Sequence, residues 1–465
     1  MEWLSRRLDF GKSDLKRFDF CSQGSSKIRI LRLENSDRNH VVTPDISDFT
    51  TEDEMIEWLE SEKSTLELPG LVLVMHQRLV ATDLQGVKAI PYRESTFKRL
   101  AERLHQHHSL SFLLRRVSTA IVNFRHVAWE INGKPSPSLV YNCKSDTESP
   151  PSVNYPDDVA LSVTSFPNLG TTHAVMYGCT QPIIKSTTKY LKDFGGQAIH
   201  PLVMPMIFAE IERARLFDLL DKERTTLEQR ILDLETKLRG EAQSPTCEKA
   251  DPEPLLRMRD CESTKLWMDV NRLKNGLHSL RIQLQNMIEH SESLAMTYFK
   301  PPVEGKNGID KYVEERRTGS RIEMRLREMV DELGSKIRTC EGLLGGMSLS
   351  AQMESNYYTR RDAKVSIIIA NATKRDGSQM RSISLLGMIF LPGTFLASLF
   401  SMSFFNWTPP DGNQIISPWI ALYGVLAVVI TLVTVWRMRK WMEAEEKKAK
   451  DEMRREVNSD GDSIV

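Results

Sequence analysis

Two long apolar segments near the carboxyl end constrain this chain most, because few environments can accommodate them. Residues 383–405 form a run of 23 without a charged side chain, and residues 418–436 form a second run of 19. As helices they would be about 35 Å and about 28 Å long, close to a hydrocarbon core of about 30 Å. Buried helices of a large soluble core are the alternative, but such helices usually keep a polar stripe and neither segment has one. The sequence therefore predicts a hairpin of two membrane spans, residues 382–436.

Basic residues beside the two segments predict the orientation of this hairpin. Arg381 precedes the first segment, and Arg437, Arg439 and Lys440 follow the second. The connecting loop, residues 406–417, has no Lys or Arg. Because basic residues stay on the cytosolic side of a membrane, the amino and carboxyl termini are expected in the cytosol and the loop outside.

Composition and motifs narrow the possible functions. The chain has 465 residues, of which 62 are basic and 62 acidic, so its formal net charge is zero. This balance argues against a protein held on nucleic acid by bulk charge, and no nucleic-acid partner is expected. The six Cys residues are scattered singly, and there is no Walker loop, His-Glu-x-x-His or Gly-x-Ser-x-Gly motif. We therefore expect neither an enzyme nor a bound cofactor.

Residues 1–200 are expected to form a cytosolic α/β domain. Short apolar runs bounded by Pro and Gly have strand character, and amphipathic patterns of helical spacing lie between them. The expected strands are 27–33, 71–75, 138–143, 159–166 and 173–179, and the expected helices include 52–63 and 95–104.

Residues 201–381 are expected to form a helical stalk domain, because apolar residues recur there every three or four positions like a coiled-coil seam. The first seam comprises Leu266, Val270, Leu273, Leu277, Leu280, Leu284, Met287, Ser291 and Leu294. A second comprises Leu220, Leu227, Ile231, Leu234 and Leu238, with Gly240 as the expected helix end, and a third Ile322, Leu326, Met329, Leu333, Ile337, Cys340 and Leu344. No proline occurs in residues 352–382, so the last cytosolic helix is expected to continue into the first span. Residues 437–465 would form a mixed-charge cytosolic tail.

The first apolar segment carries a family resemblance. Phe390-Leu391-Pro392-Gly393-Thr394-Phe395 and Ser401-Met402-Ser403-Phe404, with a short outward loop, a second span and a basic exit, resemble the CorA superfamily of divalent-cation channels and transporters. The likeness is greatest to its fungal CorA-like branch; it is good over the hairpin, moderate over the helical region and weak over residues 1–200. It implies a CorA-like funnel, in which α+β cytosolic domains and long coiled-coil-like helices lie below a pore. It also implies a homo-oligomer, a pentamer, that moves Mg²⁺ or a similar cation across a lipid bilayer.

The chain departs from that family at the outer end of the first span. The family's Gly-Met-Asn triplet, aligned through Pro-x-Thr-Phe, falls on Ser401, Met402 and Ser403, which we take as the selectivity-filter positions. In the family the Asn helps to hold a hydrated cation, whereas Ser403 offers a shorter hydroxyl acceptor. This change motivates an alternative, a membrane-anchored sensor or scaffold that does not transport. A third class is a soluble coiled-coil protein with a simple tail anchor.

Helical spacing selects one face of the first span as the candidate pore lining, which comprises Met380, Ile383, Gly387, Leu391, Thr394 and Ser398. Its inner part is apolar, which suits a gate that closes by dewetting, and its outer hydroxyls suit a hydrated ion. The alternative is that Gly387, Gly393, Ser398 and Ser401 are small residues that pack helices in lipid.

Metal-binding candidates outside the span are few. Asp362 and Asp376 are the candidates for bridging a regulatory divalent cation between subunits, although ion pairs with neighbouring Arg residues are the commoner use of such residues. His105, His107 and His108 are close enough in sequence to suggest a metal site, but they lack a nearby Cys or carboxylate at ligand spacing. For these three residues a solvated helix face is the favoured interpretation.

Overall fold

The computed structural model describes residues 8–20, 27–34, 44–61, 69–78, 87, 89–115, 119–131, 133–147, 158–243, 253–301, 310–402 and 418–461. The chain divides into two compact units, Met1–Gln352 and Met353–Val465. The amino-terminal unit contains an α/β domain and long helices, and the carboxyl-terminal unit contains the two apolar segments.

A seven-stranded sheet forms the centre of the amino-terminal unit, with strand order β3-β2-β4-β9-β8-β7-β6. Neighbouring strands are antiparallel except β4 and β9, which are parallel. The five interior strands are those that the sequence predicts, so the expected α/β domain is confirmed. The strands are β2 Ile28–Glu34, β3 Asp45–Phe49, β4 Gly70–Gln77, β6 Ile121–Ile131, β7 Lys134–Lys144, β8 Ala160–Phe166 and β9 Thr171–Cys179. Two short strands, β1 Asp19–Phe20 and β5 Ala89–Ile90, pair separately.

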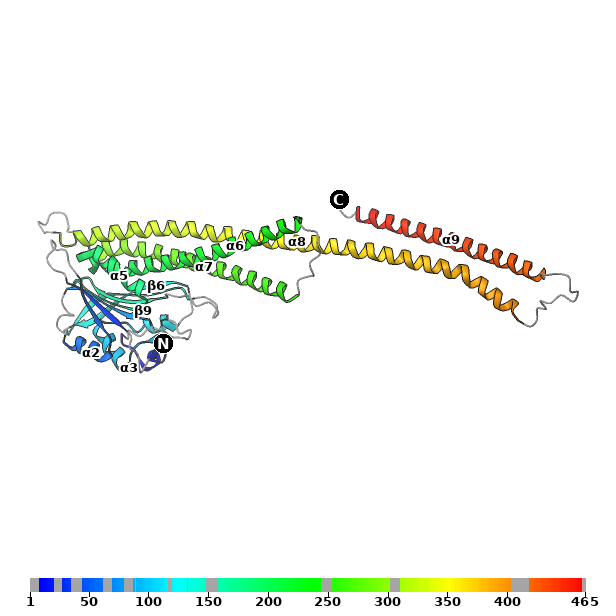
Figure 1. The fold of residues 1–465 in the computed structure, drawn as a ribbon. Coiled ribbons are helices and arrows are strands. Elements are labelled where there is room, and N and C mark those ends of the chain that lie inside the picture. The colour runs from blue at the N-terminus through cyan, green and yellow to red at the C-terminus, as the bar shows by residue number, and fades with distance from the viewer. Residues whose placement is uncertain are drawn as a thin grey trace. The chain divides into compact units, whose positions relative to one another are not determined.

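Helices cover both faces of this sheet (Figure 1). On one face α2 and α3 bury Met55 and Phe97 against strand residues such as Val74 and Val175. On the other face α5 and the long helices bury the opposite strand residues, so that the domain has two apolar cores. The short helices are α1 Lys12–Leu15, α2 Glu52–Ser61, α3 Glu94–Arg103, α4 Leu110–Arg115 and α5 Gln181–Phe194, and a 3₁₀ helix spans Gly195–Ile199.

Long helices follow, and their predicted seams are largely buried. They are α6 Val203–Gln243, α7 Glu253–Thr297 and α8 Val313–Phe400. Every seam residue of α7 is 6% exposed or less, and the α8 seam is buried through Cys340. On α6 Leu220 is buried, but Ile231 is 40% exposed, so that seam is covered only in its first part.

The predicted end of α6 at Gly240 is wrong, because the helix continues to Gln243. A glycine inside a helix costs only about 1 kcal/mol relative to alanine, which the surrounding helix formers can offset. The seam residues Leu234 and Leu238 lie on the helical backbone, but their side chains are outside the described ones.

A buried ion pair ties α6 to the end of β7. Glu212 Oε1 accepts hydrogen bonds from the backbone N–H of Asp146 at 2.8 Å and from Arg215 Nη2 at 2.7 Å, while its Oε2 accepts one from Arg215 Nε at 2.9 Å. Arg215 Nη2 also donates to the carbonyl of Asp146 at 2.8 Å. Glu212 is 0% exposed and Arg215 7%. Gly276 of α7 lies against the Asp146 carboxylate, where a Cβ would collide with it.

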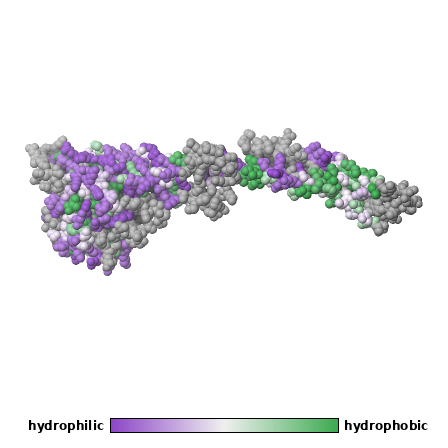
Figure 2. All heavy atoms as spheres, viewed as in Figure 1, coloured by the Kyte–Doolittle hydropathy of each residue, from purple (hydrophilic) through white to green (hydrophobic). Residues whose placement is uncertain are grey.

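The carboxyl-terminal unit consists of the second part of α8 and of α9 Pro418–Gly461. Each contains a stretch long and apolar enough to cross a membrane, and the chain buries only 6% of the α8 window and 0% of the α9 window. Figure 2 shows apolar side chains gathered at the surface over this part of the chain. Buried helices of a soluble core would be covered on most sides, so the structure supports a membrane location for these helices.

Candidate functional site

The predicted pore-lining residues lie on one face of the carboxyl-terminal part of α8 and are exposed, as are most other side chains of this segment, Phe390 and Phe395 among them. Met380, Ile383 and Leu391 are 70%, 71% and 73% exposed. The other three members, Gly387, Thr394 and Ser398, are exposed as well. Successive members are three or four residues apart, so they recur about once per turn on one helix face. We call these six residues the α8 stripe; that it lines a pore stays a prediction.

The side of α8 that contacts α9 lies opposite the α8 stripe. Leu396 is 3% exposed, and the hydroxyl of Tyr423 in α9 donates to the carbonyl of Gly393 at 3.4 Å. At about 100° per residue, Gly393 and Leu396 lie roughly 150° around the helix from the mean direction of the stripe. Of the small residues considered for helix packing, Gly393 therefore faces α9, whereas Gly387 and Ser398 do not. Contact between the two helices leaves the stripe open.

The hydroxyl of Thr394 is bound to its own helix. It lies 3.0 Å from the carbonyl oxygen of Leu391 and 3.1 Å from that of Phe390, to which it donates. Because its proton is used by the backbone, the oxygen presents lone pairs to its surroundings. An acceptor oxygen at this position suits contact with water around a cation.

The filter positions lie beyond the end of the helix. Because α8 ends at Phe400, Ser401 and Met402 lie in the turn that follows, not on the predicted helix of residues 383–405. The backbone N–H of Ser401 donates to Ala397 at 3.0 Å and that of Met402 to Leu399 at 3.3 Å, so the helix tightens before it ends. Both side chains are exposed. The third filter position, Ser403, and the predicted outer loop lie outside the described residues.

Charged residues of α8 are segregated by face just before the apolar segment. Asp362 and Asp376, both exposed, lie within roughly 25° of the direction of the α8 stripe. All the Lys and Arg side chains of this segment lie roughly 80° or more away from that direction, and they are Arg360, Arg361, Lys364, Lys374, Arg375 and Arg381. The side that carries the stripe is therefore acidic, and the side toward α9 is basic.

The end of the second apolar segment carries an interfacial pair. Lys440 Nζ lies 4.8 Å from the ring centroid of Trp436, within the range of a cation–π contact. An aromatic ring with a long basic side chain is the usual anchor at a boundary between lipid and water. This pair fits the predicted cytosolic exit of the hairpin.

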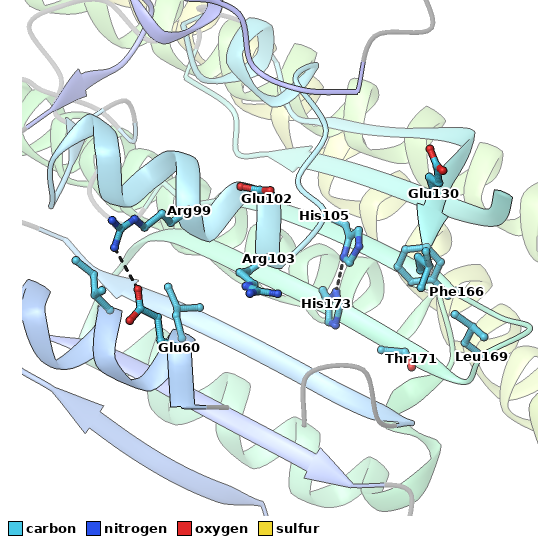
Figure 3. A pocket seen from close by; sticks show the side chains of 13 residues that line it. Glu60, Arg99, Glu102, Arg103, His105, Glu130, Phe166, Leu169, Thr171 and His173 are labelled. Carbon is cyan, nitrogen blue, oxygen red and sulfur yellow. Dashed lines mark hydrogen bonds and ion pairs between the residues drawn. The ribbon is translucent and has the colours of Figure 1, made fainter. Parts of the chain in front are cut away.

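A second candidate site is a cavity of about 640 Å³ in the α/β domain (Figure 3). It lies among α2, α3, the turn after α3 and the ends of β6, β8 and β9. It is lined by Ile56, Leu59, Glu60, Arg99, Glu102, Arg103, His105, Glu130, Ile131, Phe166, Leu169, Thr171 and His173.

Two histidines meet at the wall of this cavity. His105 and His173 are stacked with ring centroids 5.3 Å apart, and their Nδ1 atoms lie 3.2 Å apart. One Nδ1 must carry a proton that the other accepts. Burial lowers the pKa of His105 to about 3, with smaller contributions from His173 and Arg103, so its imidazole is neutral at pH 7.

The prediction that His105, His107 and His108 form a solvated helix face is wrong. The helix α3 ends at Arg103, and the N–H groups of His105 and Gln106 close a Schellman motif onto Glu102 and Ala101 at 3.3 and 2.8 Å. His107 is 5% exposed and is hydrogen-bonded to Ser109. Among the described residues there is no group of three or more His, Cys, Asp or Glu placed to bind a metal, so the alternative of a histidine metal site gains no support either.

Sequence reasoning did not single out His173, the partner of His105. The available signal was polarity within buried strands, because Thr164, Thr171 and His173 are polar residues that are buried in β8 and β9. Thr171 and His173 line the cavity, and the hydroxyl of Thr164 donates to the carbonyl of His105 at 2.6 Å.

Comparison of the chain with models of known protein families finds no match, and neither does comparison with curated proteins.

Proposed function

We propose that this chain is a subunit of a homo-oligomeric channel for divalent cations, Mg²⁺ or a similar ion, in a lipid bilayer. The observation that carries the proposal is the α8 stripe with its acidic continuation at Asp362 and Asp376. Copies of α8 that face one another across an axis through this stripe would line a conduit. Five copies would be the number implied by the CorA resemblance.

The uncovered stripe supports assembly around an axis. Since α9 packs on the opposite side of α8, each copy can turn its stripe inward while α9 lies outside, toward lipid. The hydroxyls of Thr394 and Ser398 would then meet water in the conduit. Met380, Ile383 and Leu391 would form its apolar constriction.

The segregation of charge supports cations over anions as the permeating species. A carboxylate about 8 Å from a divalent cation in water contributes about 1 kcal/mol, which salt screening reduces to roughly 0.4 kcal/mol. A ring of copies multiplies this attraction. The basic residues on the other side of α8 lie away from the axis in this arrangement.

Flux into liposomes tests the proposal. The purified protein, shown to be oligomeric, is reconstituted and the uptake of Mg²⁺, Zn²⁺ and Co²⁺ is measured with a trapped indicator. Asp376→Lys changes two charges, or about 0.8 kcal/mol per subunit, so flux should fall roughly fourfold for each subunit in the ring. Glu443→Lys makes the same charge change on an exposed position of α9 and should change flux less than twofold.

Two outcomes would contradict the channel. Equal effects of the two substitutions would show that Asp376 does not face the ions. No flux above that of empty vesicles would favour the membrane-anchored sensor or scaffold. Ser403→Asn separates these classes further, because a channel should change its rate or selectivity and a scaffold should remain without transport.

A further inference from the structure

We propose that the cavity among α2, α3 and the β8–β9 turn binds a small organic anion, with Arg103 as its charge partner. The ligand class is a carboxylate or phosphate group on an apolar or aromatic body. This inference concerns the α/β domain alone and does not depend on the channel function.

Three Glu and two Arg line the cavity, and the feature that favours an anion is the guanidinium of Arg103. The carboxylates of Glu60, Glu102 and Glu130 are all exposed, and Glu60 is paired with Arg99 at 3.4 Å. Arg103 is half-buried, and no ion-pair partner is found for it among the described residues. Figure 3 shows its side chain at the wall of the cavity, which His173 also lines. A guanidinium in this state offers a planar fork of donors that matches a carboxylate or a phosphate.

The backbone at His105 supports a role for its side chain. His105 has φ 51°, in the left-handed region, at the position after a helix where glycine is usual. The imidazole is nevertheless held firmly, by edge-to-face contacts of 5.2 Å to both Trp129 and Phe166 and by the bond to His173. His105 thus combines an unfavourable backbone conformation with a side chain that is held in place beside an open cavity. Backbone strain of this kind is typical of binding sites, and we infer a binding role for the His105 side chain.

The histidine pair supplies polar atoms that complement a charged head group. In a neutral pair joined through Nδ1, one ring has a protonated Nε2 and the other an Nε2 lone pair. A ring N–H of this kind is a donor that an anion beside Arg103 accepts. The hydroxyl of Thr171 lies in the same wall.

The apolar residues of the cavity wall indicate what kind of group the charged head of the ligand is attached to. Phe166, Leu169 and Ile131 form an apolar surface on one side of the cavity, and Ile56 and Leu59 contribute from α2. A volume of about 640 Å³ lies within the range of about 300–1,000 Å³ that is typical of small-molecule sites. A bare inorganic ion would leave most of this surface in contact with water, so an organic anion fits better.

Calorimetric titration of the full-length protein in detergent tests the proposal. The probes are inorganic phosphate, AMP and benzoate; the last two distinguish a phosphate from a carboxylate head on an aromatic body. At least one of them should bind with Kd below about 1 mM, and at least tenfold more tightly than inorganic phosphate. Arg103→Gln should weaken that binding at least tenfold. Lys98→Gln removes one positive charge from an exposed position of the same helix outside the cavity lining, so it should change binding less than twofold.

His105→Gly separates binding from folding. Glycine suits the left-handed turn and offsets part of the packing that the imidazole supplies, so this variant should still unfold cooperatively, at a lower melting temperature, while its affinity for the probe falls. The proposal is overturned if neither organic probe saturates below about 1 mM, if Arg103→Gln and Lys98→Gln weaken binding equally, or if His105→Gly binds as the parent does.

Discussion

Replacing Glu212 with Gln tests the buried connection between α6 and the sheet. The substitution preserves the size of the side chain and an oxygen that can still accept from the N–H of Asp146. It removes the negative charge that faces Arg215, whose Nε and Nη2 lie 2.9 and 2.7 Å from the Glu212 carboxylate. Because Arg215 is only 7% exposed, its guanidinium would lose the carboxylate that its Nε and Nη2 contact and would gain little bulk water in exchange.

The expected cost follows from this burial. Removing one partner of a buried ion pair destabilises a protein by about 3–5 kcal/mol, mostly through the uncompensated charge that remains. The retained bond to the carbonyl of Asp146 at 2.8 Å places the effect toward the lower end of that range. At roughly 2–4 °C per kcal/mol for a domain of this size, the melting temperature should fall by about 6 to 12 °C.

Glu228→Gln is the matched control for this prediction. Glu228 pairs with Arg224 on the same helix at 2.7 Å, but the two side chains are 56% and 55% exposed, so the loss should stay below about 0.5 kcal/mol. Melting is followed by intrinsic fluorescence on both purified variants. Equal melting temperatures for Glu212→Gln and Glu228→Gln would refute the reasoning from burial.

Further predictions concern the contact between Gly276 and the Asp146 carboxylate, the stability of the protein at acid pH, and the α8 stripe. Gly276→Ala should lower the melting temperature because its Cβ collides with the Asp146 carboxylate, whereas Gly342→Ala, with open space around it, should not. The folded-state pKa of His76 and His200 is about 3 and that of His290 about 4, below the ordinary value of 6.5, so the unfolded chain binds protons more readily. The contribution of these neutral histidines to the free energy of unfolding is therefore complete above pH 6.5 and is lost as the pH falls below that value. The loss is up to about 1.4 kcal/mol per pH unit for each histidine. Melting temperatures that do not change between pH 7.5 and pH 5 would contradict this prediction. Leu391→Asn should raise flux in the liposome assay by wetting the apolar constriction, while Leu396→Asn, on the side toward α9, should impair membrane assembly instead.

The strands show where sequence patterns are informative. All five interior strands were predictable because β4, β8 and β9 are buried on both faces and β2 and β7 on most of theirs, which leaves nearly continuous apolar runs. The two that were missed, β3 and β6, are the edges of the same sheet. Their residues, such as Asp45 and Arg125, alternate with apolar ones or face water, so the apolar run that marks a strand is absent.

The two candidate sites differ in how many of their residues could be predicted from the sequence. The α8 stripe depends only on spacing along one helix, so the structure keeps all six predicted residues on one face. The cavity depends on residues far apart in the chain, such as Arg103 and His173, which only the sheet register and the turn after α3 bring together. The turn itself was missed because a histidine occupies a position where glycine would have marked the end of the helix.

Within the unit Met353–Val465, α8 makes chain length as well as residue identity important, because the acidic pair Asp362 and Asp376 and the α8 stripe follow one another on the same helix. One residue inserted near Gly377 would rotate every later side chain by about 100° relative to the two aspartates and advance it by about 1.5 Å. Seven inserted residues would restore the angle to within roughly 20°. This part of the helix should therefore tolerate substitutions much better than insertions or deletions.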